Sequence, residues 1–181
     1  MLMTYVDNIL PTGNNYDEIT RIKRQLLLKY EGRNLGTLKR ILGVNISITE
    51  QGISLNQQLY AESIVSEGMG SVQVRGASTP LDPGIDMTAR QEDEAILDGN
   101  IYPYPTLVGK LMFLVVMTRP DLSNSVHELG RRTNAPWLRH GEGYNMYYVP
   151  YISTHPDIGI SYDRQNREVM SNILTGYSNS D

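Results

Sequence analysis

Apolar residues recur at helical spacing in two long stretches of the chain. Over residues 16–30, isoleucine and leucine return every third or fourth position, opposite a face that carries arginine and lysine. This spacing predicts an amphipathic helix, and Asn14 or Asn15 is placed to cap its N-terminus. Over residues 104–117 the apolar stripe is wider, which predicts a largely buried helix.

Shorter stretches alternate between apolar and polar residues, as strands with one buried face do. The first hairpin is expected to turn at Asp7-Asn8, a residue pair that favours turns. A second hairpin is predicted over residues 44–55. Residues 158–162 alternate again, and residues 169–177 are expected to return beside them as a further strand. Strands and helices in one chain predict the α+β fold class.

Glycine and proline bound the remaining helices. A helix is predicted from Gln57 to Glu67, ending at Gly68, and another over residues 121–132, where Pro120 suits the first turn. Residues 137–153 are rich in tyrosine, but two glycines and Pro150 oppose a stable helix there.

Composition excludes several classes of protein. The 181 residues carry 16 lysines and arginines against 20 aspartates and glutamates, a net charge of −4, which is unlike a strongly basic nucleic-acid binder. The absence of cysteine excludes disulfide partners and thiolate chemistry, and it fits an intracellular chain. The longest apolar run, residues 111–117, is too short to cross a membrane, and no signal peptide begins the chain.

The charge is distributed unevenly. Residues 1–45 hold seven basic and four acidic side chains, whereas residues 46–101 hold two and nine. The basic residues of the first segment suit contact with a nucleic-acid backbone, or they form a solvated helix face. The candidates are Arg21, Lys23, Arg24, Lys29, Lys39 and Arg40.

Asp7 is the sharpest candidate for chemistry. A carboxylate at the tip of a tight turn is held rigidly, as metal-dependent phosphoryl transfer requires, where two Mg²⁺ ions sit roughly 3.5–4 Å apart. The plainer interpretation is that Asp7-Asn8 only makes a turn. Four tyrosines suit base stacking or, as we favour, half-buried packing; they are Tyr144, Tyr147, Tyr148 and Tyr151.

Several short segments of the chain match the motifs of one protein family, in the order in which that family carries them. Residues 5–10 read YVDNIL, residues 118–122 read TRPDL and residues 176–181 read GYSNSD. They resemble, in order, the motifs of reverse transcriptases from copia-type LTR retrotransposons, the last being similar to the opening strand of ribonuclease H. Other segments that carry the resemblance are residues 34–44, 52–60, 78–83, 104–111 and 156–160.

The resemblance implies four parts, each an expectation about this chain. Residues 1–67 would be the end of the polymerase palm and the entry to the thumb, followed by an acidic, Pro/Gly-rich linker over residues 68–101. Residues 102–154 would be a helical connection. Residues 155–181 would be the truncated start of a ribonuclease H-like domain, with its first hairpin.

Both catalytic centres depart from the family pattern. The resemblance implies that Asp7 is a Mg²⁺ ligand, but Asn8 stands where the family has its second aspartate, and Asn179 stands at the ribonuclease H aspartate. The other palm aspartate is expected upstream of Met1. The resemblance implies Mg²⁺ as cofactor, but the loss of a carboxylate argues against its binding here, and contact with an RNA/DNA template–primer is expected to be weak or absent. The missing upstream polymerase part is a further candidate partner.

These observations leave three functions open. The first is a fragment of a copia-type reverse transcriptase, an RNA-directed DNA polymerase by descent that is inactive alone. The second is a non-enzymatic module for nucleic-acid binding or interaction. The third is a translated retrotransposon remnant without function.

Overall fold

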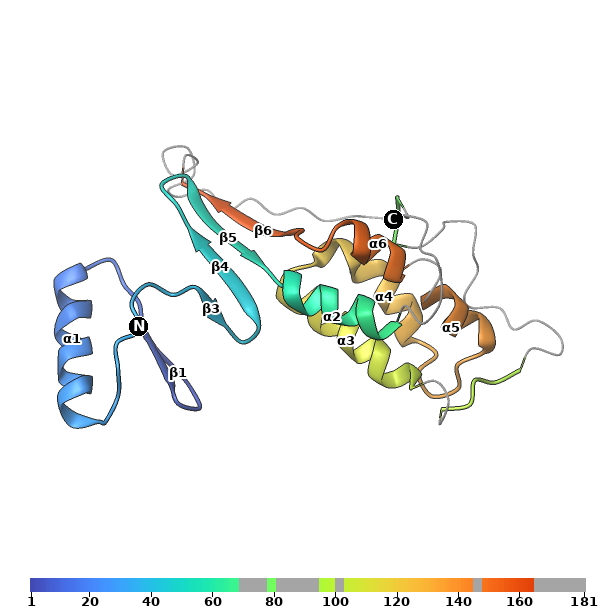
Figure 1. The fold of residues 1–181 in the computed structure, drawn as a ribbon, viewed down its shortest axis with the longest axis horizontal. Coiled ribbons are helices and arrows are strands. Elements are labelled where there is room, and N and C mark those ends of the chain that lie inside the picture. The colour runs from blue at the N-terminus through green and yellow to red at the C-terminus, as the bar shows by residue number, and fades with distance from the viewer. Residues whose placement is uncertain (69–77, 81–94, 100–102, 145–147, 165–181) are drawn as a thin grey trace, which may run out of the picture. The chain divides into compact units, whose positions relative to one another are not determined.

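The computed structural model describes residues 1–68, 78–80, 95–99, 103–144 and 148–164. The chain divides into two compact units, Met1–Leu38 and Lys39–Asp181. Figure 1 shows the elements of each unit. The α+β class expected from the sequence is confirmed, because both helices and antiparallel sheets are present.

The first unit is a hairpin followed by a helix. Strands β1 (Leu2–Tyr5) and β2 (Asn8–Pro11) pair antiparallel, and α1 (Tyr16–Lys29) follows. The Asn15 side chain accepts a hydrogen bond from the Glu18 backbone N–H at 3.1 Å, which confirms the predicted cap. No residue of α1 is buried, so this unit offers little core of its own.

The turn of this hairpin lies one residue earlier than predicted. Tyr5 pairs with Asn8, so Val6 and Asp7 make the turn and Asn8 begins β2. The predicted turn at Asp7-Asn8 is therefore wrong, because pairing along the strands sets the register and outweighs a local turn preference. The register places Val6 at φ 48°, a left-handed conformation that β-branched residues rarely adopt.

The second unit begins with a four-stranded antiparallel sheet. Its order is β3 (Arg40–Ile41), β4 (Val44–Ile48), β5 (Gly52–Asn56) and β6 (Gly159–Asp163). The predicted hairpin over residues 44–55 is confirmed by the pairing of β4 with β5. The strand predicted over residues 158–162 is confirmed as β6. The pairing of β6 with β5 was not predicted. The expected return strand over residues 169–177 lies outside the described residues.

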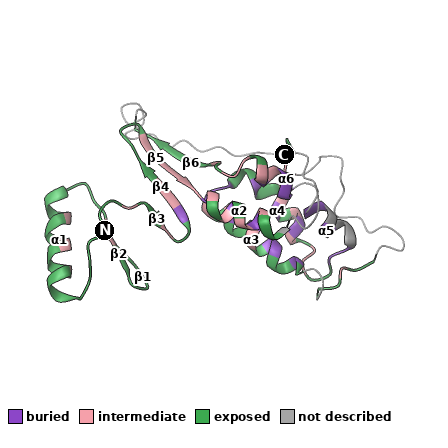
Figure 2. Cartoon of the chain, in the orientation of Figure 1, coloured by how far each residue is buried: buried purple, intermediate pink, exposed green. Residues whose placement is uncertain are grey.

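Helices follow the sheet and hold the core. They are α2 (Gln58–Gly68), α3 (Tyr104–Met117), the 3₁₀ turn η1 (Pro120–Leu122), α4 (Ser123–Gly130), α5 (Leu138–Gly143) and α6 (Val149–Thr154). Leu111 and Leu114 of α3, Leu129 of α4 and Ile152 of α6 have no exposed surface and lie in one apolar cluster. Figure 2 shows the buried positions gathered on these helices. The predicted helix over residues 104–117 is confirmed to the residue.

The tyrosine-rich stretch is helical in two places, against the prediction from its glycines and proline. Gly141 and Gly143 lie within α5. Pro150 lies in the first turn of α6, where the missing N–H has no helical partner to lose. Burial of Tyr144 and Tyr148, each with 0% exposed surface, outweighs the low helix propensity of these residues.

The acidic linker falls mostly outside the described residues. A described part of it touches the helical core region: the Leu97 N–H donates to the Pro136 carbonyl at 2.8 Å, and Ile96 pairs with Trp137. Within the described ranges, no helix has the length and apolar character that crossing a membrane requires.

Candidate functional site

Asp7 lies at the exposed tip of the first hairpin, as the sequence predicts for a rigidly held carboxylate. Strands β1 and β2 position it through the pairs Thr4–Ile9 and Tyr5–Asn8. Its chain neighbours Tyr5 and Val6 are 51% and 82% exposed, so the tip is open to solvent on this side. The tip therefore offers one carboxylate in the turn and, in the next residue, the neutral amide of Asn8.

This donor set does not fit a two-metal centre. Such a centre needs several carboxylate oxygens to hold two divalent cations close together. No group of three histidine, aspartate or glutamate side chains is arranged to hold a metal ion within the part of the chain that the structure describes. Asn179 lies outside that part. We derive no catalytic step through Mg²⁺ from these residues.

Four of the predicted basic residues share α1, but their surroundings differ. Arg21 forms an ion pair with Glu18 at 2.6 Å, and this hydrogen-bonded guanidinium holds the pKa of Glu18 below its ordinary value. The pair is therefore kept until the pH falls through that lowered pKa. The Lys29 ammonium lies 5.5 Å from the centroid of the Tyr30 ring.

Arg24 is an exposed cation of α1. It is one turn from Arg21 on the same face, and no ion pair or hydrogen bond of its side chain to a described residue is seen. Lys23 is half-buried beside the apolar stripe of the helix. Lys39 and Arg40 belong to the second unit, where Arg40 Nε donates to the Asn45 side chain at 2.9 Å.

The described tyrosines of this stretch do not form a stacking platform. Tyr144 and Tyr148 are fully buried, rather than half-buried as predicted, because they pack in the apolar cluster of the helices. Burial raises the pKa of the Tyr148 hydroxyl above its ordinary value. Tyr151 is half-buried and lies beside His155, with ring centroids 5.0 Å apart. Tyr147 lies outside the described residues.

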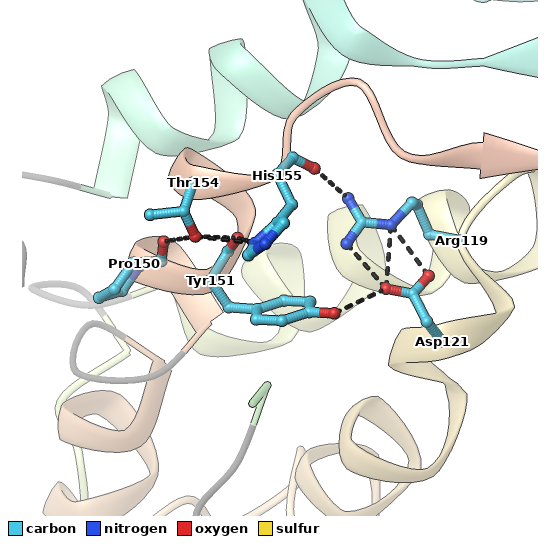
Figure 3. A network of polar contacts seen from close by, with 6 residues as sticks. All are labelled: Arg119, Asp121, Pro150, Tyr151, Thr154 and His155. Carbon is cyan, nitrogen blue, oxygen red and sulfur yellow. Dashed lines mark hydrogen bonds and ion pairs between the residues drawn. The ribbon is translucent and has the colours of Figure 1, made fainter. Parts of the chain in front are cut away.

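The sequence did not predict the network of hydrogen bonds that forms around the buried Arg119. This side chain is 1% exposed, and its Nε and one terminal nitrogen donate to the Asp121 carboxylate at 2.8–3.1 Å. Its other terminal nitrogen donates to the His155 carbonyl at 2.9 Å. Figure 3 shows Tyr151 reaching the same carboxylate, at 3.4 Å. The signal in the sequence was an arginine and an aspartate on either side of Pro120.

The cluster continues to the end of α6. The Thr154 hydroxyl lies 3.1 Å from the Pro150 carbonyl and 2.8 Å from His155 Nδ1. These contacts close the last turn of the helix within the same network (Figure 3). The buried Arg119 guanidinium is paired with the Asp121 carboxylate and the His155 carbonyl. Such a satisfied arrangement is typical of a residue that stabilises the fold.

Part of the chain is similar to reverse transcriptases. Residues 1–83 match the family model described as reverse transcriptase (RNA-dependent DNA polymerase). The chain is 29% identical over 98% of its length to the retrovirus-related Pol polyprotein from transposon TNT 1-94 of Nicotiana tabacum. It is 26% identical over 99% of its length to the corresponding polyprotein from transposon RE2 of Arabidopsis thaliana.

The chain is similar to copia-type reverse transcriptases. It covers 15% and 12% of those two polyproteins. It is also 31% identical, over 76% of its length, to an uncharacterized mitochondrial protein of Arabidopsis thaliana, of which it covers 55%. No solved structure matches the chain. Asp7 lies within the residues that match the reverse transcriptase family model.

Proposed function

We propose that this chain is a segment of a copia-type reverse transcriptase that does not synthesise DNA by itself. The observation that carries the proposal is the hairpin tip, where Asp7 stands next to the neutral Asn8. An amide in place of a carboxylate removes one negative charge from a metal site. Loss of one preorganised charge commonly costs about a hundredfold or more in rate.

The assignment of parts follows the same proposal. The match over residues 1–83 supports a palm end and thumb entry in residues 1–67. The buried helices of the second unit support a helical connection over residues 102–154. We keep residues 155–181 as the start of a ribonuclease H-like segment, whose expected second strand and Asn179 lie outside the described residues.

A primer-extension assay tests the inactivity. With poly(rA)/oligo(dT) and Mg²⁺ or Mn²⁺, we expect no nucleotide incorporation by the chain above that of its Asp7→Ala variant. An Asn8→Asp variant is expected to stay inactive as well, because restoring one carboxylate leaves the donor set short of a two-metal centre. Incorporation by the chain that Asp7→Ala abolishes would contradict the proposal. An active reverse transcriptase on the same primer serves as the positive control.

A non-enzymatic nucleic-acid-binding module is the second candidate, and Arg24 favours it. A lysine or arginine that contacts a phosphate releases a counterion, so binding weakens as salt rises. If α1 contacts an RNA–DNA hybrid, Arg24→Gln should reduce the slope of log affinity against log salt by about 0.9. Fluorescence anisotropy with a labelled hybrid measures this slope.

The matched control is Lys110→Gln. This change also removes one positive charge, but Lys110 is already ion-paired with Glu67, so the slope should stay unchanged. Equal slopes for Arg24→Gln and the unchanged chain would exclude Arg24 as a contact. Absence of any binding at about 50 mM salt would exclude the module and favour a remnant without function.

A further inference from the structure

Two stretches of the second unit lead from the sheet to the helices. Gln57 joins β5 to α2, and residues 155–158 join α6 to β6. The orientation of a sheet on neighbouring helices depends in part on the residues that hold the chain crossings between them. The residues that contact Gln57 and His155 therefore decide how firmly the sheet is attached.

Both crossings are held by neighbouring residues at the end of α3. The Thr118 hydroxyl donates to Gln57 Oε1 at 3.0 Å, and the Arg119 guanidinium donates to the His155 carbonyl at 2.9 Å. Gln57, Thr118 and Arg119 are each no more than 1% exposed. Hydrogen bonds in such surroundings are costly to break without replacement.

The end of α3 is itself held rigidly. The backbone N–H groups of Thr118 and Arg119 both donate to the Leu114 carbonyl, at 2.9 and 2.8 Å. The planar guanidinium of Arg119 is also fixed by its bidentate contact with Asp121. Each crossing is thus hydrogen-bonded to a residue that is itself hydrogen-bonded to α3.

The sheet is built so that the two crossings move together. Strand β6 pairs with β5 over its whole length, from Asn56–Gly159 to Gly52–Asp163. A Cβ on Gly159 would overlap the Leu55 carbonyl oxygen, and one on Gly52 would overlap that of Tyr162. Because both glycines permit this close approach, β5 and β6 form one continuous ladder. The ladder is connected to the helices through Gln57 after β5 and through the segment from His155 before β6.

We propose that Thr118 and Arg119 form a latch that fixes the orientation of the β4–β5–β6 sheet on the helices. While both hydrogen bonds are made, the sheet holds one orientation. When the latch opens, the paired strands of the sheet turn as one body about the two crossings and keep their own pairing. This device does not depend on polymerase activity or on nucleic-acid binding.

Distance measurements between spin labels test the latch in the full chain. Because the chain has no cysteine, Ser47→Cys in β4 and Asn124→Cys in α4 take the labels without background. We expect one narrow distance distribution in this labelled parent. Thr118→Val and Asp121→Asn should each broaden it about twofold, since each removes one support of the latch. Arg131→Gln, which breaks an ion pair within the α4 region, should leave it unchanged.

Each other outcome overturns the proposal. A parent distribution as broad as those of the variants would show that no latch operates, and narrow distributions in both variants would show that these contacts do not set the orientation. If Thr118→Val loses its helical circular dichroism, Asp121→Asn decides alone, because its side chain is already 31% exposed. Loss of helical signal in both would mean that the contacts hold the helices together instead.

Discussion

Leu111→Ala should lower the free energy of unfolding of the second unit by about 2–5 kcal/mol. Leu111 lies in the middle of α3 with 0% exposed surface, inside the cluster formed by α2, α3, α4 and α6. Truncation removes its apolar contacts and leaves a cavity that close-packed neighbours fill only in part. Urea unfolding followed by far-ultraviolet circular dichroism measures the change.

Val116→Ala is the matched control, because it truncates an aliphatic side chain on the same helix. Val116 is 72% exposed, so its truncation should change the free energy of unfolding by no more than about 0.5 kcal/mol. Losses of equal size in the two variants would contradict the assignment of Leu111 to the core. A loss confined to Leu111→Ala would support it.

Gly159→Ala should detach β6 from β5. The added Cβ would overlap the Leu55 carbonyl oxygen, so the strands have to separate at this end of the ladder. We expect a loss of about 1–3 kcal/mol, the usual cost of forcing atoms into a filled site. Native-state hydrogen exchange should show faster exchange at Leu55 and Ile160, which pair across the two strands.

The same substitution at Gly109 separates this clash from the general effect of replacing glycine. Gly109 lies inside α3, and a Cβ there would meet no atom within 4 Å. Alanine should therefore stabilise the helix by about 0.5–1 kcal/mol. Normal exchange at β5 and β6 in Gly159→Ala would show that the strands do not pair as described.

Local periodicity was enough to predict most elements. The spacing of Ile19, Ile22 and Leu26 predicted α1, and the wide stripe of residues 104–117 predicted α3, because a helix brings positions three and four apart onto one face. The turn at Val6-Asp7 and the helix that contains Pro150 were missed. In both cases strand pairing or burial outweighed the preference of a few residues.

Of the residues described as candidate sites, one was predicted from the sequence and one cluster was not. The position of Asp7 in a hairpin turn followed from the turn preference of Asp7-Asn8, although the turn was placed one residue late. The latch around Arg119 did not follow, because its partner His155 is remote along the chain. A lone buried arginine carries no periodic signal, and only its packing shows which groups satisfy its donors.

The sequence by itself determined the family resemblance, the α+β class and the positions of the main helices and hairpins. Each of these depends on the residue order or on neighbours within one or two turns. Only the tertiary structure decided that β6 joins β5 and that Thr118 and Arg119 hold both crossings. Such contacts join segments that are distant along the chain, and they form because burial leaves their hydrogen-bonding groups no water to bind.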